Sequence, residues 1–198
     1  MKKSLVIVVF LLVIMSVSGK SAEVTPYYGL AMSDSGEMTL DRGVVESSSE
    51  ASTFFGLQFG PEYLDGSVGI DFFYHSTTQA FLDTSSDTTV KKDLLGTYIN
   101  LYLAYGFLSK GNGQYWLRAY VAYPFFGSLK PLESDEDHFF SPTGLSLGLG
   151  VNVYKNIYVN LRYQMTEYEK YFTNGAAVSN LRENLKTNQL FSFISFKF

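Results

Sequence analysis

The chain has 198 residues, of which 46% are hydrophobic, 17% aromatic and 17% charged, and it contains no cysteine. This length suits one folded domain, and the combination of many aromatic and few charged residues excludes a disordered chain. The net charge of -4 and the scattered basic residues argue against nucleic acid as a partner, while the lack of cysteine excludes disulfides and thiolate metal sites.

The first 22 residues are typical of an export signal. Lys2 and Lys3 precede an apolar run, residues 5–15, which is followed by small residues up to Ala22. Cleavage after Gly19 or after Ala22 fits this pattern, and we take residues 1–22 as the signal and 23–198 as a single mature domain. An uncleaved anchor is the alternative, but the run is short for a helix crossing about 30 Å of hydrocarbon.

Eight later segments alternate with a period of two, so that apolar side chains fall on one face and small or polar ones on the other. The pattern is clearest in residues 144–154, where leucine and valine alternate with serine, glycine and asparagine. The segments are 24–33, 53–59, 67–75, 97–107, 115–125, 144–154, 157–166 and 190–198. Most have the length of about 9 to 11 residues that a tilted strand needs to cross a bilayer.

The connections between these segments alternate strictly in length. Those at 60–66, 109–113 and 155–156 are short and rich in turn residues. The four near 34–52, 76–94, 126–142 and 170–187 are long and polar. This layout predicts an all-β, eight-stranded antiparallel transmembrane up-and-down barrel, with short periplasmic turns and four long extracellular loops.

The second face of the segments favours a narrow lumen over the exterior of a soluble, lipocalin-like barrel, because it is polar but carries few lysines and glutamates. Asp71 needs a partner in such a lumen, and Arg118 and Arg162 are both candidates. Inward aromatic residues, Trp116 among them, argue for a blocked lumen, whereas several inward glycines argue for some space. The predicted polar network of the lumen consists of Asp71, Asn100, Arg118, Asn160, Arg162 and Gln164.

Aromatic residues gather near both ends of the outward faces and predict two interfacial girdles. The alternative is that they are ordinary strand aromatics, since tyrosine and phenylalanine favour strands. The predicted girdle residues are Phe59, Tyr115 and Tyr154 at the short-turn end, and Tyr74 and Phe125 at the long-loop end.

The last segment, Leu190 to Phe198, resembles the C-terminal β-signal of outer-membrane proteins, and residues 148–163 resemble the penultimate hairpins of the OmpA/OmpX and opacity-type barrels. The resemblance implies a monomer in the outer membrane of a Gram-negative bacterium, in contact with lipid and lipopolysaccharide. It also implies delivery by periplasmic chaperones and recognition by the barrel assembly machinery. The residues expected to carry that signal are Leu190, Ile194, Phe196 and Phe198.

Some eight-stranded barrels are enzymes, but this sequence shows no catalytic grouping of theirs. A lipid A deacylase family that resembles this architecture places histidine and serine two residues apart on one face, but here Ser76 directly follows His75. The acidic loop containing Asp135, Asp137 and His138 is a weak candidate for a calcium or magnesium site, and a solvated loop tip is the favoured interpretation. We therefore expect no cofactor and a non-enzymatic structural or surface-interaction anchor. A narrow channel for small or hydrophobic solutes is the alternative, ahead of a lipid A-modifying enzyme.

Overall fold

The computed structural model describes residues 22–40, 43–49, 52–63, 66–83, 88–111, 114–131, 138–173, 176–178 and 185–198. The expected export signal lies outside these residues except for Ala22. In this part of the chain no helix is both long and apolar enough to span a membrane. The strands are β1 (Ala22–Leu40), β2 (Gly43–Ser49), β3 (Ser52–Tyr63), β4 (Gly66–Asp83), β5 (Thr88–Gly111), β6 (Gln114–Pro131), β7 (His138–Tyr154), β8 (Ile157–Thr173), β9 (Ala176–Val178) and β10 (Leu185–Phe196).

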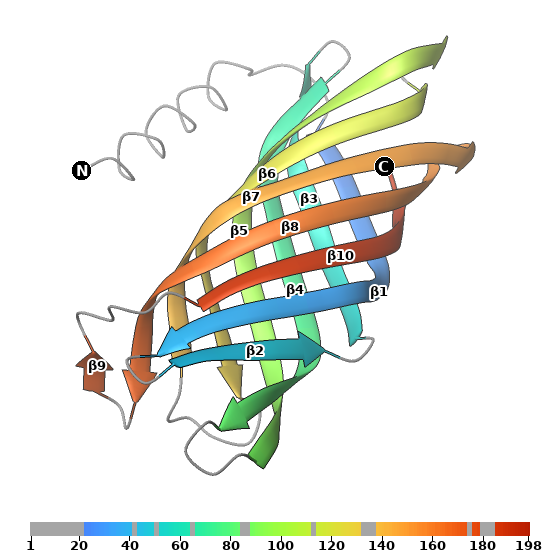
Figure 1. Ribbon diagram of the computed structural model, residues 1–198. Coiled ribbons are helices and arrows are strands. Elements are labelled where there is room, and N and C mark those ends of the chain that lie inside the picture. Colours follow the sequence, from blue (N-terminus) through green and yellow to red (C-terminus); the bar gives the residue numbers. More distant parts are fainter. Residues whose placement is uncertain are drawn as a thin grey trace.

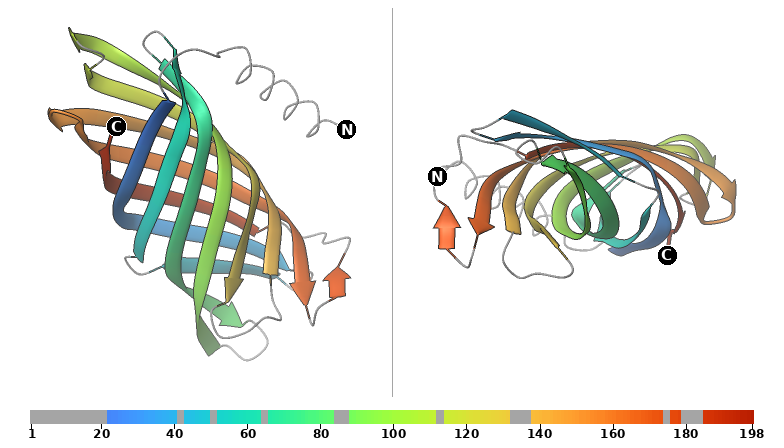
Figure 2. Two further views of the ribbon diagram at one scale, coloured as in Figure 1. Left: turned by 180° about the vertical axis from the view of Figure 1, so that it is seen from behind. Right: turned by 60° about the horizontal axis from the view of Figure 1, so that its bottom comes forward.

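Eight of these strands, β1, β3 to β8 and β10, form a closed antiparallel barrel (Figure 1). The first and last strands close it, since Tyr27 pairs with Ser195 and Ala31 with Phe191. Strand β2 pairs with β1 and β4, as β3 does. It therefore lies between the same two strands as β3 and extends that part of the barrel wall. The short β9 pairs with β8. Both views in Figure 2 show the strands tilted around one axis, and the prediction of an all-β, eight-stranded antiparallel barrel is confirmed.

The predicted alternation of faces appears as alternating burial along the strands. In β1, Tyr28 and Leu30 are 59% and 52% exposed, whereas Tyr27 and Ala31 are 4% and 2% exposed. In β7, Leu147 and Leu149 face outward while Ser146 is fully buried. Because a barrel has no open edge, each strand can bury one face in the interior and leave the other against its surroundings.

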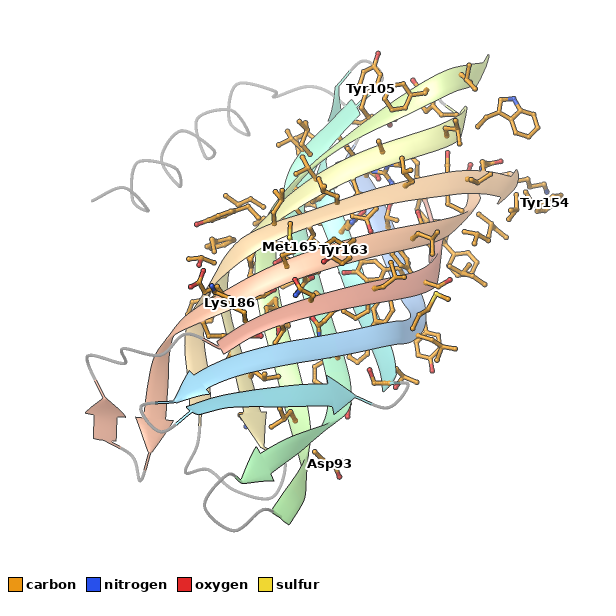
Figure 3. The ribbon with its side chains drawn as sticks, viewed as in Figure 1. Asp93, Tyr105, Tyr154, Tyr163, Met165 and Lys186 are labelled. Carbon is orange, nitrogen blue, oxygen red and sulfur yellow. The ribbon has the colours of Figure 1, made fainter. Side chains whose placement is uncertain are left out.

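The outer surface changes in character from one end of the barrel to the other. In Figure 3, Tyr105 and Tyr154 lie near the short-turn end, Tyr163 and Met165 lie between, and Lys186 lies toward the long-loop end. At about 3.3 Å per residue and a tilt of about 40°, the largely apolar outward runs 157–165 and 95–107 are about 20 and 30 Å high. This brackets the apolar band of about 25 Å of an outer-membrane barrel.

Several strands are longer than the alternating segments, and the longest extensions lie at the long-loop end. Strand β5 has 24 residues and begins at Thr88, whereas the alternation begins at residue 97. Its pairing with β4 continues to Asp83 opposite Thr88. Polar residues such as Lys91, Lys92 and Asp93 interrupt the apolar alternation in these extensions, so the pattern that identifies the membrane-level segments does not identify them.

The predicted orientation of Tyr115 and Trp116 is wrong. Tyr115 is 8% exposed and lies inside the barrel, whereas Trp116 is 52% exposed and lies outside. The β5–β6 hairpin is irregular here, with a positive φ of 55° at Leu108 and a register shift between Ser109 and Gly111. Trp116 and Leu117 face outward in succession, and the two-residue period is broken there. Phe59 and Tyr154 face outward, and Tyr74 stacks on the outward ring of Phe55. Phe125 is partly exposed and lies at a register shift, where Phe126 is the exposed residue.

Candidate functional site in the barrel interior

A buried ion pair occupies the middle of the interior. The Arg162 guanidinium lies 2.9 Å from the Asp71 carboxylate, and both side chains are 0% exposed. Tyr27 donates a hydrogen bond to Asp71 Oδ1 at 2.5 Å, and Asn100 donates to Oδ2 at 3.0 Å. Arg162 also donates to Ser146 Oγ at 3.2 Å. These five residues form the central cluster, and of the two candidates it is Arg162 that pairs with Asp71.

Further polar side chains extend the central cluster along one wall. Ser146 donates to Gln164 Oε1 at 3.2 Å, and Gln164 donates to Thr166 Oγ1 at 3.1 Å. On the other side of Arg162 along β8, Asn160 donates to Ser195 Oγ at 2.9 Å. The structure thus brings five of the six predicted lumen residues close to one another along the β4, β5 and β8 walls, while the sixth, Arg118, belongs to a different cluster.

Arg118 is part of a second charged group near the short-turn end, which we call the mouth cluster. It pairs with Glu23, which is 2% exposed, and it donates to Ser67 Oγ at 2.8 Å. Lys197 lies 2.6 Å from Glu62 and 3.7 Å from Glu23. The mouth cluster, which consists of Glu23, Glu62, Ser67, Arg118 and Lys197, lines a small pocket with a cavity volume of about 10 Å³.

Glu23 is not among the predicted site residues, because the first alternating segment starts at Val24, next to the expected cleavage site. A signal for it was present. The inward positions Tyr27, Gly29 and Ala31 extend with the same period back to Thr25 and Glu23, and Thr25 donates to Glu23 Oε1 at 2.9 Å.

Toward the long-loop end, aromatic side chains fill the interior. Phe54 contacts Phe73 and Phe191, with ring centroids 5.3 and 4.8 Å apart. His75 is stacked between Phe73 and Tyr98 at 5.5 and 5.7 Å. Arg162 joins the two levels, because its guanidinium lies 4.7 Å from the centroid of the Phe73 ring. The members of this aromatic cluster, each at most 4% exposed, are Phe54, Phe73, His75, Tyr98, Phe191 and Phe193.

The inward glycines do not leave open space. A β-carbon at Gly148 would overlap the ring of Tyr120, and one at Gly56 would overlap the ring of Tyr27. The same relation holds for Gly96 with His75 and for Gly106 with Tyr115. Each glycine therefore accommodates an aromatic ring from a neighbouring strand, an arrangement that stabilises glycine-containing sheets.

The candidate catalytic and metal residues do not form a site in the described part of the chain. His75 is fully buried, with its Nε2 3.1 Å from Gln189 Nε2, while the next residue, Ser76, is partly exposed on the opposite face. No group of three or more acidic, histidine or cysteine side chains within the described residues could hold a metal ion. Asp135, Asp137 and the side chain of His138 lie outside the described residues.

The residues expected to form the assembly signal lie on the outward face of β10 and just after it. Ile194, Phe196 and Phe198 are 46%, 41% and 76% exposed, and Leu190 is partly exposed. The backbone of Phe198 exchanges two hydrogen bonds with Val24, at 2.9 and 3.3 Å, and so closes the barrel between its first and last strands.

Comparisons with known proteins identify the fold and nothing narrower. No protein-family model matches the chain, and no curated protein matches its sequence. Among solved structures, the crystal structure of Neisserial surface protein A (NspA) matches with a TM-score of 0.53 and 12% identity, covering 90% of this chain and 100% of that one. The outer membrane protein OprG from Pseudomonas aeruginosa matches with a TM-score of 0.48 and 14% identity, covering 92% and 98%. The chain thus has the fold of the small eight-stranded outer-membrane β-barrels.

Proposed function

We propose that this protein is a non-enzymatic barrel of the outer membrane of a Gram-negative bacterium, and that it serves as a structural anchor for surface hairpins. The observation that carries the proposal is the filling of its interior at successive levels by the mouth, central and aromatic clusters. Eight strands enclose an interior that side chains can fill, so a barrel of this size needs no lumen to be stable. A filled barrel provides a membrane anchor and not a route for solutes.

The outer surface supports a membrane location. Large apolar side chains cover it, including Leu103 at 55%, Leu149 at 62% and Leu161 at 52% exposure. Water would disfavour so large an exposed apolar surface, whereas hydrocarbon favours it. Charged outward residues, Asp93 and Lys186 among them, appear toward the long-loop end in Figure 3.

The strand extensions support a display role. Strands β4 and β5 remain paired from His75 opposite Gly96 as far as Asp83 opposite Thr88. Hydrogen-bonded hairpins of this kind hold the connections at their tips away from the apolar band. We propose that these hairpins contact partners outside the cell, and that a channel for small or hydrophobic solutes is the competing function.

Cysteine labelling on intact cells tests the location and the orientation, because the native chain has no cysteine to interfere. Lys186→Cys places a thiol at the long-loop end, and Lys155→Cys places one in the short turn between β7 and β8; both positions are exposed. A membrane-impermeant maleimide should label Lys186→Cys on intact cells. It should label Lys155→Cys only after the outer membrane has been permeabilised.

The opposite pattern, or equal labelling of both variants on intact cells, would contradict the proposed orientation. Recovery of the folded protein in the soluble periplasmic fraction would contradict the membrane location. Folding of each variant is verified by the difference in gel migration between unheated and heated samples.

The assembly route is a further part of the proposal. Leu190, Ile194, Phe196 and Phe198 would present the outward face that the barrel assembly machinery reads after delivery by periplasmic chaperones. Deletion of Phe198 should lower the yield of folded barrel in the outer membrane, and an unchanged yield would count against this role.

A further inference from the structure

The barrel closes where its first strand, β1, pairs with its last strand, β10, and the two lie side by side in Figure 1. We call this pairing the seam. A slip of the seam by one residue would turn the inward side chains of one strand outward, but a slip by two residues would keep every side chain on its own face. The alternation of apolar and polar faces therefore does not select one register. The selection must come from contacts that are specific to each rung of the seam.

The inward side chains of the two strands match in size along the seam. At three successive inward rungs a large side chain lies opposite a small one, and all of these residues are buried. Close packing favours such pairs, because two large side chains at one rung would overlap and two small ones would leave a cavity. The pairs are Ala31 with Phe191, Gly29 with Phe193, and Tyr27 with Ser195.

Two of these rungs leave little freedom. A β-carbon at Gly29 would overlap the β-carbon of Phe193 and the carbonyl oxygen of Ser192, so glycine is required at this close approach of the strands. The Phe193 ring reaches the next rung, where its centroid lies 5.0 Å from that of the Tyr27 ring. Tyr27 in turn donates its hydroxyl hydrogen bond to Asp71. The seam is therefore connected directly to the central cluster.

A charged contact follows at the short-turn end of the seam. Lys197 lies just beyond β10, and its backbone N–H donates to the carbonyl oxygen of Asn156 at 2.9 Å. Its ammonium group lies 2.6 Å from Glu62 on β3 and 3.7 Å from Glu23 on β1. A slip of β10 by two residues toward the long-loop end would set Lys197 opposite Tyr27, about 7 Å along the seam from its present place. Both contacts with the carboxylates depend on the observed register.

We propose that the inward side chains of β1 and β10 select the register in which the barrel closes. The large and small pairs oppose a slip toward the short-turn end, because that slip would set Phe193 against Tyr27. A slip toward the long-loop end would leave Gly29 opposite Ser195, and the ion contacts of Lys197 oppose it as well. Lys197 is thus a positioning residue for closure. Because strand stagger is linked to the tilt and diameter of a barrel, this register also influences which side chains meet in the filled interior.

Disulfide crosslinking measures the register, because the native chain has no cysteine. Tyr28 lies opposite Ile194 on the outer face. Tyr28→Cys is combined with Ile194→Cys to report the observed register, with Ser192→Cys to report a slip toward the short-turn end, or with Phe196→Cys to report a slip toward the long-loop end.

The complete chain is expressed, and folding of each variant is verified by gel migration before oxidation. Opposite positions are within disulfide reach, whereas α-carbons displaced by two residues are about 9 Å apart and out of reach. With no other change, the cysteine pair at positions 28 and 194 should crosslink about tenfold more than either of the other two pairs.

The exchange variant Phe193→Ser, Ser195→Phe conserves composition but reverses the order of large and small on β10. In the observed register it would set two rings against each other at Tyr27 and leave Gly29 opposite a small residue. A slip toward the short-turn end restores the pairing of large with small, so crosslinking of position 28 to 192 should exceed crosslinking to 194 about threefold. The matched control Phe193→Leu, Ser195→Ala changes the same positions but keeps their order, and it should retain the crosslink to 194.

Lys197→Gln tests the charged contact separately. The side chain remains similar in size but loses its attraction to Glu23 and Glu62. Crosslinking of position 28 to 196 should therefore rise about threefold, in line with the modest strength of partly exposed ion pairs.

Retention of the crosslink between positions 28 and 194 in the exchange variant, as in its control, would show that side-chain size does not select the register, and it would overturn the proposal. If the exchange variant does not fold, Lys197→Gln decides: an unchanged yield of the crosslink between positions 28 and 196 would overturn the proposal. The same unchanged yield beside a shifted exchange variant would overturn the positioning role of Lys197.

Discussion

The two halves of the barrel interior are stabilised by different interactions. From the short-turn end to the middle, charges are held by opposite charges: Glu23 by Arg118 and Lys197, and Asp71 by Arg162. Toward the long-loop end, Phe54, Phe73 and Phe191 fill the space mainly by ring contacts, and Arg162 packs against Phe73 at the boundary. When a substitution removes the partner of a buried charge, the loss of stability depends on which residue that partner was. When a substitution removes a buried ring, the loss comes mainly from packing contacts. Substitutions in the two halves should therefore differ in size and in whether a second substitution can restore stability.

The largest effect is expected for Asp71→Ala, because it leaves the fully buried Arg162 without its counter-charge. The free energy of unfolding in urea should fall by about 5 kcal/mol, at the upper end for a broken buried ion pair. The double variant Asp71→Ala, Arg162→Met should recover a large part of this loss. A double-mutant cycle should show strong coupling between Asp71 and Arg162 and weak coupling between Asp71 and Arg118. Strong coupling to Arg118 would contradict the observed pairing.

Phe54→Ala should have the next largest effect, because it opens a cavity among rings that are almost fully buried. We expect a loss of about 3 kcal/mol, with little dependence on salt or pH. The adjacent residue Phe55 is a matched control, since it is 52% exposed on the outer face and stacks on Tyr74 at 4.6 Å. Phe55→Ala should cost about 1 kcal/mol. Equal losses for the two variants would show that the interior cluster is not packed.

Gly148→Ala tests the contact between glycine and an aromatic ring. The added β-carbon would overlap the Tyr120 ring, so the ring must move, and the expected loss of stability is about 2 kcal/mol. In a Tyr120→Ala background the same change should cost almost nothing. Equal costs in both backgrounds would mean that the Tyr120 ring does not occupy the space above Gly148.

The smallest effect is expected at the rim of the mouth cluster. Lys197 and Glu62 are 2.6 Å apart, but their side chains are 15% and 25% exposed. Glu62→Gln should therefore cost only about 0.5 kcal/mol, and this difference from the native protein should decrease at high salt. Glu23→Gln, at a side chain that is 1% exposed, is the buried counterpart and should cost more. A larger loss for Glu62→Gln than for Glu23→Gln would reverse this order.

The alternation of side chains was sufficient to predict the fold and nearly all of the inward and outward positions, because the two-residue period of a strand is a local property. It failed at Tyr115 and Trp116, which lie in the irregular β5–β6 hairpin, because such a backbone irregularity leaves no mark in the composition. The partner of Asp71 was not predictable, since it depends on how the strands are staggered around the barrel. The strand extensions were missed because polar residues such as Lys91, Lys92 and Asp93 interrupt the apolar alternation there, although Leu94 is buried.

The inward glycines show a similar limit. The sequence identifies Gly56 and Gly148 as inward, but the rings that cover them, Tyr27 and Tyr120, come from neighbouring strands. Cross-strand register decides which ring meets which glycine, and this register is not a local property of the sequence. The inference of open space from glycine alone was therefore wrong.

The filled interior is the central claim, and planar-bilayer conductance of the folded barrel tests it most directly. Folding is verified first by the difference in migration between heated and unheated samples, and a barrel of known conductance is inserted in parallel as a positive control. The aromatic, central and mouth clusters predict silence from the native protein across the range of applied voltage. Reproducible discrete current steps from a verified folded barrel would contradict the claim and would favour a narrow channel.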